Sequence, residues 1–432
     1  MIRESKRIFI GLVEIAGFYN RLCEGFEKIG VDVEFVTLSN HSFEYPKKSS
    51  KYILPKMISF LLKKHNQYSD SFFIRKLFWI SLYLLKVPLF IWAILFYDVF
   101  IFSSGISFFS SQIDLPILKI FRKNIIFQFH GSDSRPPYFD GPFLFGIQKI
   151  GEKEIRYIKR KRNIIKNINR WADYIIDTPT AGHFHTKPFI NWLVLGLPCV
   201  LPKKPYVAKK EGNSRKLRIL HSPSYPAIKG TYEIRKIIKE LQQELELCGY
   251  TIEYVEIIGQ PNEIVMREIE LCDLVVDQLF ADYGMPGFAS EAASFGKPVV
   301  IGGYAATYWH EVNPNGVILP THFVDPDEVK QTIRQLILDP SALKMSSLAH
   351  REFIENTWEA SRVAERYLRI VNGEKIDEWL VFPESIIYVQ GCGVRKERII
   401  DVIKEIIENF GFESLHLDDK PNLKKNIEDF LK

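Results

Sequence analysis

The chain has 432 residues, with 57 Lys and Arg against 52 Asp and Glu and a formal net charge of +5 at pH 7. Hydrophobic residues at 46% and charged residues at 25% are globular proportions, which exclude global disorder, collagen-like repeats and a membrane protein with many spans. The net charge is too small for this length to indicate a nucleic-acid-binding protein. Five scattered cysteines without paired metal-ligand spacing are typical of a reducing compartment, so we expect a cytoplasmic protein of two to three domains.

The N-terminal part alternates between strand-like and helical runs, as βαβ units around a parallel sheet do. Strands are expected at residues 8–13, 33–36, 99–102 and 125–129, with a helix at 20–29. Residues 77–97 form an apolar stretch that is long enough to span a membrane, but Lys86 and Pro88 lie in its middle. We therefore expect a buried or interfacial helix that leads into the next strand; a single-pass anchor is the alternative.

A strongly basic helix is expected at residues 152–170, followed by a strand at 172–177. Residues 149–170 carry nine basic side chains against Glu152 and Glu154, a larger excess than that of the whole chain. Such a helix can lie on anionic lipid. The alternative is a solvated helix face whose long side chains cover apolar surface. The Pro- and Lys-rich residues 198–214 are expected to form a linker.

A second alternating set follows, with strands expected at residues 217–220, 251–258, 274–276 and 298–301, a helix at 232–247 and helical pattern at 330–369. We predict an N-terminal acceptor lobe at 1–205, a nucleotide-sugar lobe at 206–373, and an extension at 374–432 whose role the pattern does not indicate. Glycines gather at strand ends of the second lobe, where open parallel sheets bind ligands.

Several motifs are absent. No G-x-G-x-x-G follows the first strand, and no G-x-x-x-x-G-K-[ST] or H-E-x-x-H occurs in the chain. A nicotinamide enzyme and a P-loop NTPase are therefore disfavoured, and we expect no metal site.

Residues 282–300 combine a glycine-containing loop with a helix expected to start near Ser290. Backbone N–H groups at a helix start face the loop and attract anions, which predicts a seat for a diphosphate. Glu291 can accept hydrogen bonds from ribose hydroxyls. The alternative is ordinary charge compensation at a helix N-terminus.

Residues 221–231 lie between a strand and a helix, with Lys229 placed to neutralise phosphate oxygens. The alternative is a solvated lysine before a capping threonine, Thr231.

These two segments in this order, followed by Gly-Lys-Pro-Val-Val at 296–300, resemble the GT-B-fold glycosyltransferases of the retaining family four, which includes enzymes of bacterial surface-glycan synthesis. The resemblance implies an α/β fold with two Rossmann-like lobes, a cleft between them, and closing helices near residues 353–358 and 363–370 that cross back to the first lobe. It also implies a UDP- or GDP-linked sugar as substrate, retention of configuration, and neither cofactor nor metal. In the family two glutamates are separated by seven residues, whereas here Tyr283 stands at the first position. This departure puts the contacts to the donor sugar in doubt.

The resemblance also implies site residues. His130, which with Gly131 matches the family's histidine-glycine pair, would contact the donor sugar or the acceptor hydroxyl; a structural histidine is the alternative. His130, Lys229 and Glu291 are the predicted catalytic residues. The predicted donor-binding residues are Gly17, Ser224, Gly230, Tyr283, Gly284, Met285, Gly287 and Ser290. Asp133 and Arg135 form either an acceptor-binding pair or a salt bridge with each other.

The expected function is the transfer of a sugar from a nucleoside-diphosphate donor to a glycan or lipid-linked acceptor, with peripheral contact to an anionic membrane, at the inner face of the plasma membrane, and no nucleic-acid partner. One alternative is a catalytically silent GT-B-like scaffold at the membrane, marked by Tyr283. Another is a nucleotide-sugar epimerase, although the acidic general base that it needs is not apparent.

Overall fold

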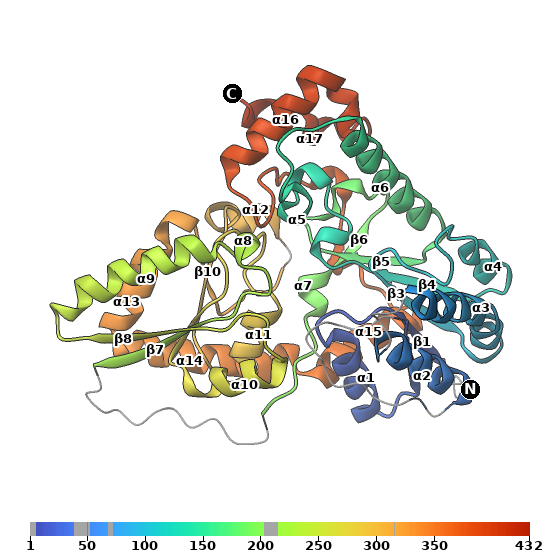
Figure 1. Cartoon of the computed structure of the whole chain (residues 1–432), viewed down its shortest axis with the longest axis horizontal. Helices are drawn as coiled ribbons and strands as arrows, with labels where there is room; N and C mark the ends of the chain where they lie inside the picture. The colour runs from blue at the N-terminus through green and yellow to red at the C-terminus, as the bar shows by residue number, and fades with distance from the viewer. Residues whose placement is uncertain (1–5, 39–49, 51, 68–71, 203–214, 315) are drawn as a thin grey trace.

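The computed structural model describes the chain except residues 1–5, 39–49, 51, 68–71, 203–214 and 315. The expected linker therefore lies mostly outside the described residues. Two sheets organise two lobes, with a third group of helices from the C-terminal extension above them (Figure 1).

The first lobe contains a seven-stranded sheet in the order β12-β6-β5-β4-β3-β1-β2, parallel except for β12. Its strands are β1 (Ile8–Leu12), β2 (Val33–Thr37), β3 (Val99–Ser103), β4 (Asn124–Gln128), β5 (Tyr174–Asp177), β6 (Phe189–Asn191) and β12 (Leu380–Val381). Its helices are α1 (Phe18–Lys28), α2 (Ile53–Gln67), α3 (Phe72–Phe96), α4 (Asp114–Ile120), α5 (Gly141–Leu144), α6 (Glu152–Trp171) and α7 (Trp192–Leu195).

The second lobe contains a parallel five-stranded sheet in the order β11-β10-β9-β7-β8. Its strands are β7 (Lys216–His221), β8 (Thr251–Glu256), β9 (Leu274–Val276), β10 (Val299–Gly302) and β11 (His322–Val324). Its helices are α8 (Pro226–Lys229), α9 (Thr231–Glu246), α10 (Asn262–Leu271), α11 (Gly287–Ser294), α12 (Trp309–Val312), α13 (Val329–Leu338) and α14 (Pro340–Phe353).

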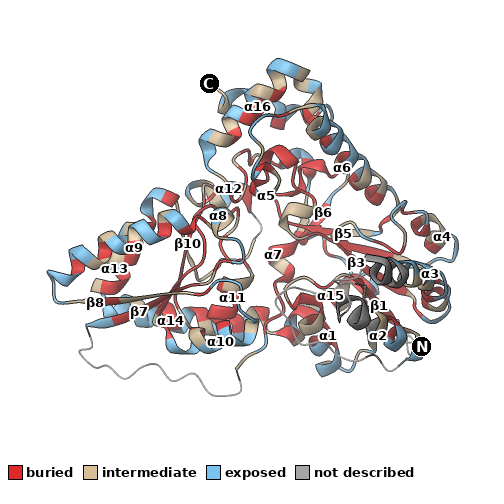
Figure 2. Ribbon diagram, viewed as in Figure 1, coloured by how far each residue is buried: buried red, intermediate tan, exposed pale blue. Residues whose placement is uncertain are grey.

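Alternation along the strands divides the core into layers. In β1, Phe9 faces a core on the outer side of the first sheet, whereas Ile8 and Ile10 face the opposite side. That opposite core continues into the second lobe, where it includes Val275 and Val299. Figure 2 shows this burial concentrated in the sheets and on the helix faces that turn toward them. The two lobes therefore share one hydrophobic layer.

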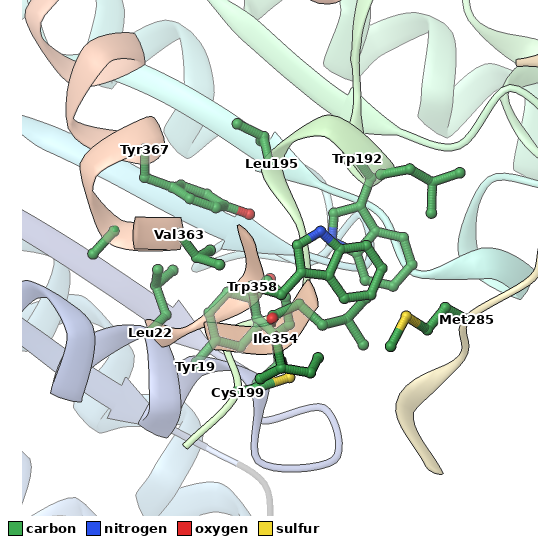
Figure 3. Close-up of a cluster of buried hydrophobic side chains, with 14 of the residues drawn as sticks. Tyr19, Leu22, Trp192, Leu195, Cys199, Met285, Ile354, Trp358, Val363 and Tyr367 are labelled. Carbon is green, nitrogen blue, oxygen red and sulfur yellow. Dashed lines mark hydrogen bonds between the residues drawn. The ribbon is translucent and has the colours of Figure 1, made fainter. Parts of the chain in front are cut away.

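The chain crosses back to the first lobe after α14, through the π-helical turn Ile354–Trp358 and helix α15 (Ala360–Asn372), which packs against α1. The approach is close because a Cβ at Gly25 in α1 would lie 2.0 Å from the carbonyl oxygen of Ala360. Figure 3 shows Trp358, Val363 and Tyr367 of this segment packed with Tyr19 and Leu22. The expected crossing is thus present.

The C-terminal extension packs chiefly on the first lobe. β12 pairs with β6 at the edge of the first sheet, and helices α16 (Lys396–Phe410) and α17 (Pro421–Phe430) cover its outer core. Val402, Ile403 and Ile406 of α16 are fully buried there. The extension is therefore an integral layer of the first lobe.

The apolar segment at 77–97 belongs to α3, which leads into β3 as expected. Among the described residues, no helix combines the length and the apolar character that crossing a membrane requires.

Candidate active site between the lobes

A cavity of about 280 Å³ lies at the carboxyl ends of β7, β8 and β9. The segments that follow these strands all contribute to its lining, as expected for a ligand site of an open parallel sheet. Ala16, just before α1, reaches it from the first lobe. The lining residues are Ala16, Ser222, Pro223, Ser224, Lys229, Ile257, Gly259, Gln260, Asn262, Val265, Asp277, Pro286, Gly287, Phe288 and Glu291.

Lys229 ends the short helix α8 and points toward the cavity. Its Nζ donates to Oε1 of Gln278 at 2.5 Å. The next residue, Gly230, adopts the left-handed conformation at a φ of 69° and caps α9, so its role in the structure is to turn the chain. Lys229 is thus a cation held at the wall of the cavity by a neutral amide.

Helix α11 begins at Gly287, three residues before the expected start at Ser290, because Pro286 is its N-cap. The N–H groups of the first turn that have no partner within the helix consequently belong to Gly287, Phe288 and Ala289, and that of Ala289 is directed at Asp277. The expected start of the helix near Ser290 was therefore wrong by three residues. Ser290 is fully buried, and its hydroxyl donates to the carbonyl oxygen of Gly287 at 2.8 Å. The anion-attracting end of α11 still faces the cavity, through Gly287 and Phe288.

Glu291 lies in the second turn of α11, at the cavity wall. Arg21 of α1 donates to its Oε1, and Nδ2 of Asn262 lies 3.3 Å from both carboxylate oxygens. The carboxylate is thus oriented by one residue from each lobe. Neither Arg21 nor Asn262 was predicted from the sequence, because they lie 270 and 29 residues from Glu291 and no local pattern signals such contacts.

His130 follows β4 and does not line the cavity. It lies in a cluster of aromatic side chains to which both lobes contribute. Its ring centroid is 5.3 Å from that of Trp192, and Trp192 in turn lies 5.7 Å from Tyr283 of the second lobe. Its Nε2 lies 3.1 Å from the hydroxyl of Tyr19. Burial lowers the pKa of His130 to about 3, so the ring is neutral at physiological pH. It can exchange hydrogen bonds but cannot supply a positive charge.

The loop before α11 carries the other predicted donor-binding residues. Met285 is fully buried beside Trp192 in the shared core (Figure 3). Gly284 packs against Phe323, and its carbonyl oxygen accepts from the hydroxyl of Thr321 at 2.5 Å. Tyr283 is half-buried, and Gly17 is the left-handed N-cap of α1 next to Ala16. These residues shape the loops around the cavity, whereas Ser224, Lys229, Gly287 and Glu291 line it.

Asp133 and Arg135 do not form a pair with each other. Asp133 accepts a hydrogen bond from the backbone N–H of His130 at 3.0 Å. Arg135, only 2% exposed, donates to Asp140 at 3.0 Å and to Asp282 of the second lobe. Both predicted alternatives placed these side chains together. Instead, Asp133 binds the backbone of His130, and Arg135 is a buried residue that joins the two lobes through Asp282.

Sequence reasoning missed Asp277, which directly follows β9 and lines the cavity close to Lys229. The available signal was its position, because a polar residue at the carboxyl end of a strand in a parallel sheet faces the ligand crevice. Among the described residues, no group of three or more His, Cys, Asp or Glu side chains is arranged to hold a metal ion.

No protein-family model and no curated protein sequence matches the chain. Among solved structures, the chain is similar to TarM, with a TM-score of 0.50, 11% identity, and coverage of 86% of this chain and 99% of that one. It is also similar to the apo structure of OtsA (TM-score 0.49, 13% identity, 86% and 100% covered) and to HepE of Anabaena in complex with UDP-glucose (0.46, 13%, 85% and 99%). The two-lobed parallel-sheet architecture, with its returning C-terminal helices, is the GT-B fold.

Proposed function

We propose that the chain is a glycosyltransferase that moves a sugar from a nucleoside-diphosphate donor to a glycan or lipid-linked acceptor. One observation carries the proposal: a single cavity combines Lys229, the free N–H groups of α11 and the carboxylate of Glu291. The first two suit a diphosphate, and the third suits the vicinal hydroxyls of a ribose. The cavity lies between the lobes, where an acceptor can approach from the first lobe.

In this proposal the chain lowers the energy of the departing diphosphate. Lys229 leaves Gln278 and binds a phosphate oxygen, while the N-terminus of α11 faces the negative charge that develops as the bond to the sugar breaks. Neutral His130 orients the reacting centre by hydrogen bonding. Retention of configuration, the absence of a metal requirement and the relation to family four belong to the proposal, and rest on the motif resemblance.

Nucleotide binding provides the first test. We expect UDP or GDP, and the corresponding nucleotide sugars, to raise the thermal midpoint, because a ligand at 100 times its Kd adds about 2.7 kcal/mol to the stability. The nucleoside without its diphosphate should give much less. If none of these nucleotides stabilises the protein, the proposal is wrong.

Substitution of Lys229 tests the site itself. Lys229→Ala should lower kcat/KM at least 100-fold, the scale seen when an electrostatic contact to a leaving group is removed. Lys236→Ala on the exposed side of α9 is the matched control and should be unchanged. Nucleotide binding without any sugar transfer would favour the scaffold alternative instead.

We further propose that the first lobe contacts an anionic membrane. Lys159, Arg160 and Lys166 of α6 are exposed, whereas Arg162 is buried and bonded to Asp419 at 2.7 Å. Helix α4, which contacts α6, is followed by the exposed Phe121. Helix α3 adds an apolar row of four exposed side chains, Leu84, Val87, Ile91 and Leu95. Basic and apolar groups together suit a lipid surface.

Charge reversal tests this contact. Lys159→Glu with Lys166→Glu should weaken binding to phosphatidylserine vesicles about 30-fold or more, since each basic residue adds about 1 kcal/mol. Lys236→Glu with Lys239→Glu, which reverses two exposed charges on α9, should have no effect. Equal binding by both double variants would contradict a contact through α6.

A further inference from the structure

A buried carboxylate lies inside the cavity to which we assign the diphosphate. Asp277 is 2% exposed and lines the cavity together with Lys229, Gly287 and Glu291. Its Oδ2 is buried and has no hydrogen-bond partner among the described residues. Packing does not account for such an atom, because a buried carboxylate oxygen is ordinarily paired.

The groups that face Asp277 come from several elements. Lys229 at the end of α8 contributes positive charge, although its amino group is bonded to Gln278. Ala289 of α11 offers its backbone N–H, and Glu291 contributes negative charge that Arg21 of α1 partly offsets. Asp277, Lys229 and Glu291 are the titratable side chains of the described lining. Burial raises the pKa of the Asp277 carboxyl, with Lys229 and the Ala289 N–H acting in the opposite direction.

A bound diphosphate changes this balance. It brings at least two negative charges into the same cavity and takes over Lys229 and the N–H groups of α11, which otherwise favour the charged carboxylate. Two like charges at close range in a buried site are relieved when one of them is protonated. Asp277 is the group placed for this, because it lines the cavity and its Oδ2 has no hydrogen-bond partner among the described residues.

We propose that Asp277 takes up one proton when the diphosphate of the donor binds, and then donates its O–H to a phosphate oxygen. The inference rests on the proposed function of the cavity. The proton comes from solvent and returns there when the nucleoside diphosphate leaves, so no covalent step is involved. Donor affinity consequently increases as the pH falls, and release of the product is favoured as the pH rises.

Calorimetric titration of the full chain with UDP, and in parallel with GDP, tests the proposal. At pH 8, where the free nucleotide is fully ionised, the measurement is made with EDTA in two buffers of different ionisation enthalpy. We expect uptake of close to one proton per nucleotide by the wild type and close to none by Asp277→Asn. Between pH 7.5 and 8.5 the wild-type Kd should rise about tenfold, and that of Asp277→Asn should stay constant.

A second variant separates the hydrogen bond from the charge. Asp277→Asn keeps a donor toward the phosphate and should bind UDP at least as tightly as the wild type at pH 8.5, whereas Asp277→Ala should bind more weakly than Asp277→Asn. Proton uptake that persists in Asp277→Asn, or wild-type binding that requires Mg²⁺ and takes up no proton, would overturn the inference. Failure of the wild type to bind either nucleotide would instead refute the proposed function.

Discussion

At the scale of residues, the buried charge group around Arg135 joins the lobes. Arg135 binds Asp140 of its own lobe and Asp282 of the other, and these carboxylates are supported by Ser132 at 2.7 Å and Thr180 at 3.3 Å respectively. One guanidinium therefore compensates two buried carboxylates. The three positions contribute unequally to stability. Loss of the arginine leaves two buried carboxylates without a cationic partner, whereas loss of one acid leaves Arg135 paired with the other.

We expect Arg135→Met to lower the free energy of unfolding by about 3–5 kcal/mol, the cost of leaving a buried charge without its partner. Asp282→Asn should cost less, because Arg135 keeps Asp140 at 3.0 Å. Urea unfolding of both variants measures the difference. Equal losses would contradict the unequal roles.

His221, at the end of β7, provides a prediction about pH. Its Nδ1 lies 2.9 Å from the carbonyl oxygen of Val276 and its Nε2 lies 2.9 Å from the hydroxyl of Thr231. Burial lowers the pKa of His221 to about 4, below the ordinary 6.5 of the unfolded chain. Its contribution to stability is therefore complete above pH 6.5 and is lost as the pH falls toward 4.

The measurement is NMR titration of the His221 ring, which should show little change between pH 8 and 5, where a free histidine titrates. In His221→Gln the fall of stability between pH 6 and 5 should be shallower by about 1.4 kcal/mol per pH unit, one proton's worth. A ring that titrates near 6.5 would contradict the buried, neutral assignment.

Residue-level prediction reached the cavity where a motif lies in one stretch of chain. Lys229 was chosen from a segment between a strand and a helix, and Glu291 from the first turn of an expected helix. Both line the cavity, and their catalytic roles stay predictions. The partners that hold them were not predictable, since Arg21 reaches Glu291 from another lobe. Arg135 illustrates the same limit: Asp133 was the neighbour in sequence, but Asp282 is the neighbour in space.

At the scale of elements, the alternating periodicity placed the nine expected strands within about two residues, because hydrophobic spacing is a local property, whereas the short strands β6, β11 and β12 were not predicted. The extension was not assigned from the sequence because its structure depends on contacts with distant residues. Strand β12 has only two residues and forms by pairing with β6, and α16 packs on the outer core of the first lobe.

A loop of the extension also reaches the second lobe. The N–H of Gly393 donates to the carbonyl oxygen of Phe280 at 2.7 Å, and that of Cys392 donates to Phe139 of the first lobe at 3.1 Å. Arg395 pairs with Glu233 of α9 at 2.6 Å. The loop therefore lies between the lobes and bonds to both.

Gly393 tests this loop against a matched glycine. Gly393 and Gly373 have φ values of 71° and 70°, but a Cβ at Gly393 would lie 2.4 Å from Ile228, whereas one at Gly373 would meet nothing within 4 Å. Alanine strains the backbone equally at both positions. We expect Gly393→Ala to cost about 1–3 kcal/mol more than Gly373→Ala in urea unfolding. Equal costs would show that the loop does not pack against the second lobe in solution.

At the scale of the whole molecule, several features connect the lobes at different places. They include the shared core around Trp192, Met285 and Trp358 (Figure 3), the Arg135–Asp282 and Arg21–Glu291 ion pairs, and the loop at Gly393. Lobes joined through a small polar interface move and unfold separately, whereas a large apolar interface couples them. Here the common core is continuous, which favours unfolding of the two lobes as one cooperative unit.

We therefore expect a single unfolding transition in scanning calorimetry, with equal calorimetric and van't Hoff enthalpies, although the chain contains two sheets. A bound nucleotide should shift this whole transition upward, because stabilising the second lobe also stabilises the first. Asp282→Asn should lower the midpoint and keep one transition, since the shared core remains. Two resolved transitions in the wild type, with only one of them moved by UDP, would show that the lobes are thermodynamically independent.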